Sequence, residues 1–150
     1  MSEIRELYQQ LIIDHGRSPR NFGALEAANH QKDGYNPVCG DELQLYIIES
    51  DGVIEDIKFE GHGCAISMAS ASLMSEALKG KTLTEADTLF ACFHQLVTEG
   101  GDYTMLKDKL GKLVVLAGVA EYPARVKCAT LAWHTMQAAI HDRNETVSTE

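Results

Sequence analysis

The sequence has no apolar run long enough to cross a membrane. Its longest one, Leu113 to Ala120, is about eight residues, whereas a membrane-spanning helix needs about 20. The first residues alternate charged with apolar side chains and lack the basic segment and apolar stretch of a secretory signal. We therefore expect a soluble protein that stays in the cytoplasm and does not bind membranes.

Basic residues are scarce, because 13 Lys and Arg stand against 22 Asp and Glu, a formal net charge of −9. Binding to a nucleic-acid backbone requires clustered cations that release counterions, and no stretch contains such a cluster. Nucleic acid is therefore not an expected partner. The sequence also lacks repeats, low-complexity tracts and linkers, and its length allows a core without disulfides. We expect residues 1–150 to form one domain.

Periodicity and turn residues divide the chain into secondary-structure elements. Apolar residues three and four apart predict helices, strict alternation predicts strands, and clusters of Gly, Asn, Asp and Pro predict loops. In chain order we expect a first helix that Ser2 caps and Gly16 follows, a loop at 18–37 with a weak extended segment at 27–32, a hairpin of 43–47 and 53–61, helices at 64–79 and 84–97, a short segment at 104–116, and a last helix from Pro123 to Ile140. This order predicts an α+β fold in which helices cover a small antiparallel β-sheet.

The four cysteines carry the strongest indication of function. In a reducing cytoplasm they are expected as free thiols, metal ligands or a sulfur-handling site rather than as a disulfide framework. They are Cys39, Cys64, Cys92 and Cys128. Cys92 lies among apolar residues without an ionisable neighbour, so we expect it in the core.

Cys39 and Asp41 lie in a tight loop before the first strong strand. Pro37 and Gly40 restrict this loop, and we expect the Cys39 thiol to be exposed. A thiolate and a carboxylate two residues apart across a turn can point at one ion, and both are Zn²⁺ ligands. The alternative is a surface loop with an incidental cysteine.

Cys64 and Cys128 lie near the starts of expected helices. Unpaired N–H groups at a helix start favour the thiolate form of Cys64, although a small apolar packing role fits the same position. Arg125 and Lys127 next to Cys128 favour a thiolate too, or they are ordinary solvated charges. His62 has glycine neighbours, and we expect its ring to face solvent rather than bind a metal.

Three motifs together resemble a known family. They are Cys39-Gly40-Asp41, Gly63-Cys64 with the Ala- and Ser-rich run after it, and Pro123-Ala-Arg-Val-Lys-Cys128. With Ser18-Pro19-Arg20-Asn21, they resemble the NifU N-terminal/IscU-like superfamily of iron–sulfur cluster assembly proteins from about residue 5 to residue 140, and the SufU branch in particular. The resemblance implies the IscU/SufE-like fold.

Two features distinguish the chain from the IscU branch of that superfamily. IscU-type scaffolds have a His directly before the last cysteine, where this chain has Lys127. The long segment 83–115 resembles an insertion that marks the SufU branch. Both features favour sulfur transfer over cluster scaffolding.

The resemblance also implies a site and a reaction. Zinc would be held by Cys39, Asp41, Cys64 and Cys128, and Cys39 would accept persulfide sulfur from a cysteine desulfurase of the SufS type. The sulfur would then pass to downstream Suf assembly components. Because a closed zinc site is inert, one ligand must leave, and Asp41 and Cys39 are the expected candidates. The alternatives are a scaffold for a [2Fe–2S] cluster and a zinc module used only for docking.

Overall fold

The computed structural model describes residues 2–37, 40–99, 107–141 and 147–148. In chain order the elements are α1 (Ser2–Arg17), β1 (His30–Asn36), β2 (Asp41–Ser50), β3 (Val53–His62), α2 (Ala65–Leu78), α3 (Leu83–Glu99), α4 (Lys107–Leu110), the 3₁₀ segment η1 (Gly111–Glu121), α5 (Pro123–Ile140) and β4 (Val147–Ser148). None of the helices in these ranges is long and apolar enough to cross a membrane.

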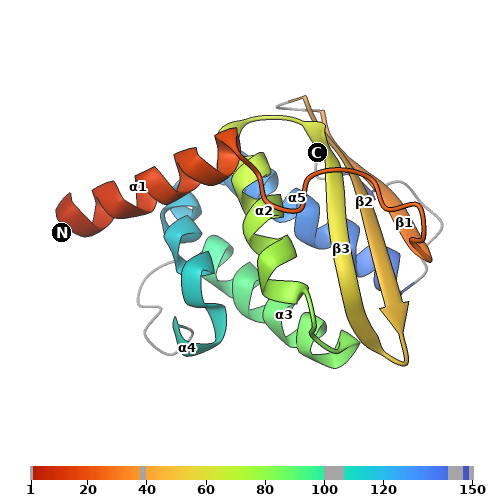
Figure 1. Ribbon diagram of the computed structural model, residues 1–150. Coiled ribbons are helices and arrows are strands. Elements are labelled where there is room, and N and C mark those ends of the chain that lie inside the picture. Colours follow the sequence, from red (N-terminus) through yellow and green to blue (C-terminus); the bar gives the residue numbers. More distant parts are fainter. Residues whose placement is uncertain (1, 38–39, 100–106, 142–146, 149–150) are drawn as a thin grey trace.

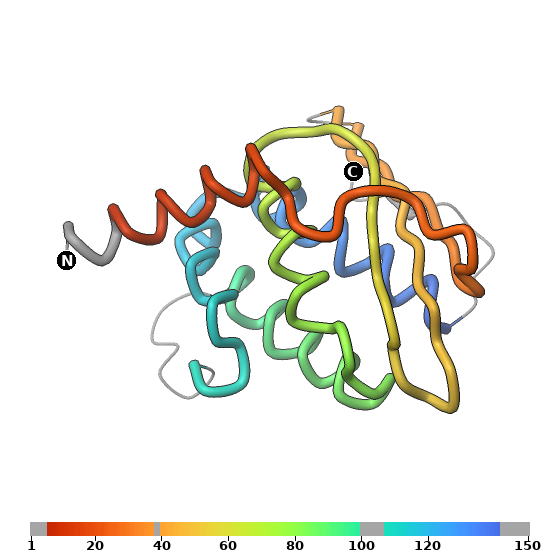
Figure 2. Tube along the Cα trace, in the orientation of Figure 1, coloured from red at the N-terminus to blue at the C-terminus, as the bar shows by residue number. Residues whose placement is uncertain are grey.

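The sheet has the strand order β3-β2-β1-β4. The β1–β2 and β2–β3 pairs are antiparallel, and β4 adds a short parallel pair at the β1 edge. Figure 1 shows the helices on one side of this sheet, with α2 and α5 nearest to it and the N-terminal half of α1 projecting away. The chain trace in Figure 2 gives the same arrangement. The expected α+β fold is confirmed.

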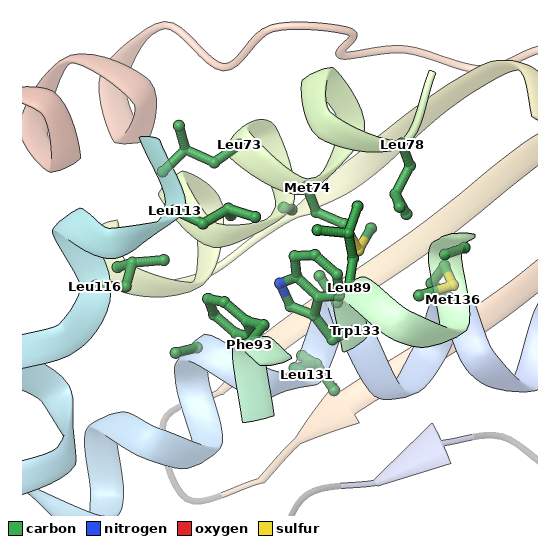
Figure 3. Close-up of a cluster of buried hydrophobic side chains, with 14 of the residues drawn as sticks. Leu73, Met74, Leu78, Leu89, Phe93, Leu113, Leu116, Leu131, Trp133 and Met136 are labelled. Atoms are coloured by element: carbon green, nitrogen blue, oxygen red, sulfur yellow. The ribbon is translucent and has the colours of Figure 1, made fainter. Parts of the chain in front are cut away.

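The core lies between the sheet and the helices. Trp133 of α5 and Phe93 of α3 are both fully buried and stack with ring centroids 4.6 Å apart. Leucine and methionine side chains from α2, α3, η1 and α5 surround them (Figure 3). Cys92 is 8% exposed and belongs to this cluster, so the expectation that it is a core residue is confirmed.

The hairpin and the last helix lie close to where the sequence predicts them, and the largest differences concern three other expected elements. The weak extended segment is a full strand, β1, which starts and ends later than expected because it pairs with β2 along its whole length. The segment expected at 104–116 is η1 preceded by one turn of α4, and residues 104–106 lie outside the described ranges.

The first helix also continues past its expected end. Gly16 lies inside α1 instead of following it, and a Cβ there would be 3.2 Å from the carbonyl oxygen of Ala65. The missing side chain therefore lets α1 pack closely against the start of α2.

A buried polar cluster joins the end of α1 to the middle of α2. His15 is 1% exposed, and its Nδ1 lies 2.7 Å from Oγ of Ser72. The backbone amide of Arg20 donates to the same hydroxyl at 2.8 Å. These contacts fix the orientation of α2, which has Cys64 at its N-terminus.

Candidate metal centre

Three of the residues singled out by the sequence come together. Asp41 begins β2, Cys64 directly precedes α2, and Cys128 lies in the second turn of α5. One ligand atom from each lies within 4.8 Å of the others. Among the residues that the structure describes, no other group of three His, Cys, Asp or Glu side chains is arranged in this way.

Strand register and helix packing bring these three residues together. Glu42 pairs with His62, so the start of β2 lies beside the end of β3, and only two residues separate β3 from α2. The Ser70 hydroxyl donates to the Ala129 carbonyl oxygen at 2.6 Å and holds α5 against α2. Cys128 therefore faces the junction between β3 and α2.

The Asp41 carboxylate is fixed from both sides. It is fully buried, Oδ1 accepts a hydrogen bond from the Cys64 backbone amide at 2.8 Å, and Oδ2 accepts one from Nδ2 of Asn36 at 3.3 Å. A buried carboxylate needs such partners. We expected Asp41 and Cys39 as the ligands able to leave a metal, but this environment holds Asp41 in place.

The two cysteines differ in exposure and in what holds them. Cys64 is half-buried and is the N-cap of α2, where its sulfur accepts from the Ser67 amide at 3.4 Å. The expected position of Cys64 at a helix start is therefore confirmed. Cys128 is only 2% exposed, and Asn36 Nδ2 lies 3.6 Å from its sulfur. Cys64 is thus the more accessible of the two thiols.

Arg125 and His62, near these motifs, make contacts outside the group of Asp41, Cys64 and Cys128. The Arg125 guanidinium lies over the Tyr122 ring, 4.6 Å from its centroid. His62 is exposed and its Nε2 lies 3.3 Å from a carboxylate oxygen of Glu42, which confirms the expectation that its ring faces solvent. Cys39, the fourth residue of the expected ligand set, lies outside the described residues.

The sequence interpretation missed Asn36, which contacts both Asp41 and Cys128. Its only signal is an Asn immediately before Pro37, three residues ahead of Cys39. Asn before Pro is also typical of ordinary turns. Sequence alone therefore gave no reason to place Asn36 among the residues around a metal.

The donor set fits a thiophilic metal. Zn²⁺ binds sulfur at about 2.3 Å and carboxylate oxygen at about 2.0–2.2 Å, so the ligand atoms of a tetrahedral site are about 3.5–3.8 Å apart. The three ligand atoms here lie within 4.8 Å of one another and need to move only slightly closer to bind the ion. N–H donors already lie beside the ligand atoms of Asp41 and Cys128, and these contacts hold both side chains in place. Thiolates also hold iron–sulfur clusters, so this donor set is compatible with both.

Comparison with known protein families assigns the chain to a family. Residues 7–129 match the NifU-like N-terminal domain. The chain belongs to this family. The expected membership in the NifU N-terminal/IscU-like superfamily is therefore confirmed.

The relatives in this family are named after two different functions, sulfur transfer and cluster scaffolding. The chain is 42% identical over 134 residues to the zinc-dependent sulfurtransferase SufU of Bacillus subtilis, covering 89% of each chain. It is 39% identical over 140 residues to the iron–sulfur cluster assembly scaffold protein IscU of Streptococcus pyogenes, covering 93% of this chain and 86% of the relative.

Solved structures of NifU-like proteins have the same fold. FiSufU from Fervidobacterium islandicum AW-1, described as a candidate cluster assembly scaffold for the SUF system, is 36% identical and superposes with a TM-score of 0.82 over 91% of this chain and 98% of that one. A NifU-like N-terminal domain from Brucella abortus, 22% identical, superposes with a TM-score of 0.81 over 92% and 94%, a likeness of fold.

Proposed function

We propose that this protein is a zinc-dependent sulfurtransferase of iron–sulfur cluster assembly, which takes persulfide sulfur from a cysteine desulfurase of the SufS type. The main support is that Asp41, Cys64 and Cys128 come together and that Cys39 is only two residues from Asp41 in the sequence. The 42% identity to a zinc-dependent sulfurtransferase supports the same function. We propose that the whole chain acts as one cytoplasmic domain.

Cys39 is the proposed fourth ligand and the sulfur acceptor. It is two residues from Asp41, so their Cα atoms are at most about 7 Å apart in any conformation. Asp41, Cys64 and Cys128 would be three of the zinc ligands, and Cys39 would be the fourth. Bound zinc supplies one chemical property here, namely a thiol that is deprotonated at neutral pH.

The transfer step is a thiol–persulfide exchange. The Cys39 thiolate attacks the outer sulfur of the desulfurase persulfide, a new S–S bond forms at Cys39, and the bond to the desulfurase cysteine breaks. The desulfurase cysteine leaves as a thiolate, so the two proteins together gain or lose no electrons. Such exchange is governed by access and by the thiolate fraction. We expect the Cys39 thiol to be exposed, whereas Cys128 is buried.

The other three proposed ligands explain how the metal stays bound during this step. Asp41 is held by two hydrogen bonds, and Cys64 is held by the start of α2. With Cys128, they keep three ligands in place after Cys39 has taken the sulfur. The persulfide on Cys39 is then available to downstream components of cluster assembly.

The alternative function is a scaffold on which a [2Fe–2S] cluster is built. The observation in its favour is the 39% identity to a protein named as an IscU scaffold, since the same thiols can hold iron. Lys127, at the position where the IscU branch has a His, favours sulfur transfer because Lys is a poor metal ligand.

Desulfurase turnover tests the proposal. A matched desulfurase is assayed for alanine production from cysteine with increasing amounts of wild-type protein, Cys39→Ser or Cys92→Ser. We expect acceleration by the wild type and by Cys92→Ser, and none by Cys39→Ser. Turnover that is unchanged by the wild-type protein, together with iron and sulfide in anaerobically purified samples, would support the scaffold instead.

A further inference from the structure

Asn36 connects two proposed ligands that come from different elements. It is the last residue of β1 and is fully buried. Its Nδ2 lies 3.3 Å from Oδ2 of Asp41, at the start of β2, and 3.6 Å from Sγ of Cys128, in α5. One side-chain amide thus contacts a proposed ligand on a strand, Asp41, and another on a helix, Cys128.

The chemistry of both neighbours requires the nitrogen of this amide to face them. An ionised carboxylate and a thiolate only accept hydrogen bonds, whereas the NH₂ group of Asn has two hydrogens to donate. One Asn can therefore serve both anions at once. Such bonds to charged acceptors are stronger than bonds between neutral groups.

The backbone of Asn36 contacts Gly40, the residue that follows Cys39 in the sequence. Its carbonyl oxygen accepts a hydrogen bond from the Gly40 amide at 2.9 Å, four residues later. This bond closes the turn between β1 and β2. The same residue therefore holds the turn with its backbone and two proposed ligands with its side chain.

Cys64 is placed by different means. Its sulfur accepts from the Ser67 amide within its own helix, at 3.4 Å. The Cys64 sulfur is thus held within the start of α2, whereas the sulfur of Cys128 is contacted by Asn36, which lies 92 positions earlier in the chain.

We propose that Asn36 is a positioning residue, which holds Asp41 and Cys128 together so that the metal stays bound when Cys39 leaves it to accept sulfur. This inference rests on the proposed function. The contribution of Asn36 should be largest when Cys39 is not a ligand, because only then do three ligands have to retain the metal. Loss of an outer hydrogen-bond partner of a metal ligand typically costs 10–100-fold in affinity.

The test uses Asn36→Leu, which keeps the approximate volume and removes the donors, with and without Cys39→Ser. Zinc dissociation constants are measured by chelator competition. The d–d and thiolate-to-metal bands of the cobalt-loaded proteins report ligand geometry. Asn36→Ala, which leaves room for water, replaces Asn36→Leu where the latter does not fold. Leu78→Ala, at the buried far end of α2, is the control for a general loss of stability.

We expect Asn36→Leu to weaken zinc binding by about 10–100-fold in the Cys39→Ser background, by less when Cys39 is present, and to alter the cobalt bands. Leu78→Ala should lower the melting temperature and leave the bands unchanged. A lower melting temperature in Asn36→Leu with unchanged zinc affinity and cobalt bands would overturn the proposal. A wild-type protein that binds zinc and cobalt without accepting sulfur would contradict only the proposed function, whereas one that binds neither metal would overturn both.

Discussion

The backbone of Gly63 lies directly against the carboxylate of Asp41. A Cβ at position 63 would overlap Oδ1 of Asp41 and lie 3.0 Å from its Cβ and Cγ. The next residue, Cys64, donates its backbone N–H to the same oxygen at 2.8 Å. The carboxylate occupies the space that a side chain at position 63 would need.

Gly63→Ala should therefore displace Asp41 and weaken metal binding. Overpacking a closely packed site typically costs about 1–3 kcal/mol, and here the Asp41 carboxylate is the group that must move. Zinc content and melting temperature should both fall. The matched control is Gly118→Ala, since a Cβ there meets no atom within 4 Å. Normal zinc content and an unchanged melting temperature in Gly63→Ala would contradict the predicted displacement of Asp41.

Removing Cys64 or Cys128 should release zinc and lower the melting temperature. Zinc binding to a folded site contributes free energy to folding. Cys64 caps α2 and Cys128 lies in α5, and both helices pack in the core region. Cys39→Ser should retain most of its zinc, because Asp41 and two thiolates remain and water can take the fourth place. Metal analysis and thermal melts with and without a chelator measure this difference. Equal zinc loss in all three variants would contradict the unequal roles.

The added sulfur should be found on Cys39. Mass spectrometry after incubation with a desulfurase and cysteine locates the persulfide, and Cys39→Ser should carry none because a hydroxyl cannot form one. Cys92→Ser should still accept sulfur, since Cys92 lies 8% exposed in the core, and should lose only some stability. A persulfide on Cys64 or Cys128 in the wild-type protein would refute the assignment.

His15 should make stability depend on pH. Its burial, and to a smaller extent Arg20, lower the pKa of His15 from 6.5, while Glu76 acts in the opposite direction. In the unfolded chain the pKa of His is about 6.5. Between the lowered value and 6.5 the unfolded state binds more protons than the folded state, so the free energy of unfolding falls as the pH falls.

We therefore expect the melting temperature to decrease below about pH 6.5, more in the wild type than in His15→Asn, which has no group titrating there. His94→Asn is the control, because His94 is exposed on α3, and it should keep the wild-type slope. An identical slope in His15→Asn would show that other groups cause the pH dependence.

Sequence patterns with a local cause predicted most of the fold. The Asp51-Gly52 turn between two alternating segments gives the β2–β3 hairpin, and Cys64 caps α2 because a helix begins directly after the strand. Pro123 begins α5, as its fixed φ favours. These features depend on residues close together in the chain, and the three cysteine motifs also gave the expected metal chemistry.

Contacts between distant residues decided the rest. The sequence showed Asp41, Cys64 and Cys128 as separate motifs, and only the β2–β3 register and the packing of α5 bring them within 4.8 Å. It contained nothing that marked Asn36, because an amide that serves two anions is recognisable only when both lie beside it. Similarly, the sequence pattern at Gly16 is typical of a helix end, and only the packing of Ala65 against Gly16 shows why a glycine is needed inside α1. Local propensity acts over a few residues, whereas the centre depends on close packing between segments as many as 92 positions apart.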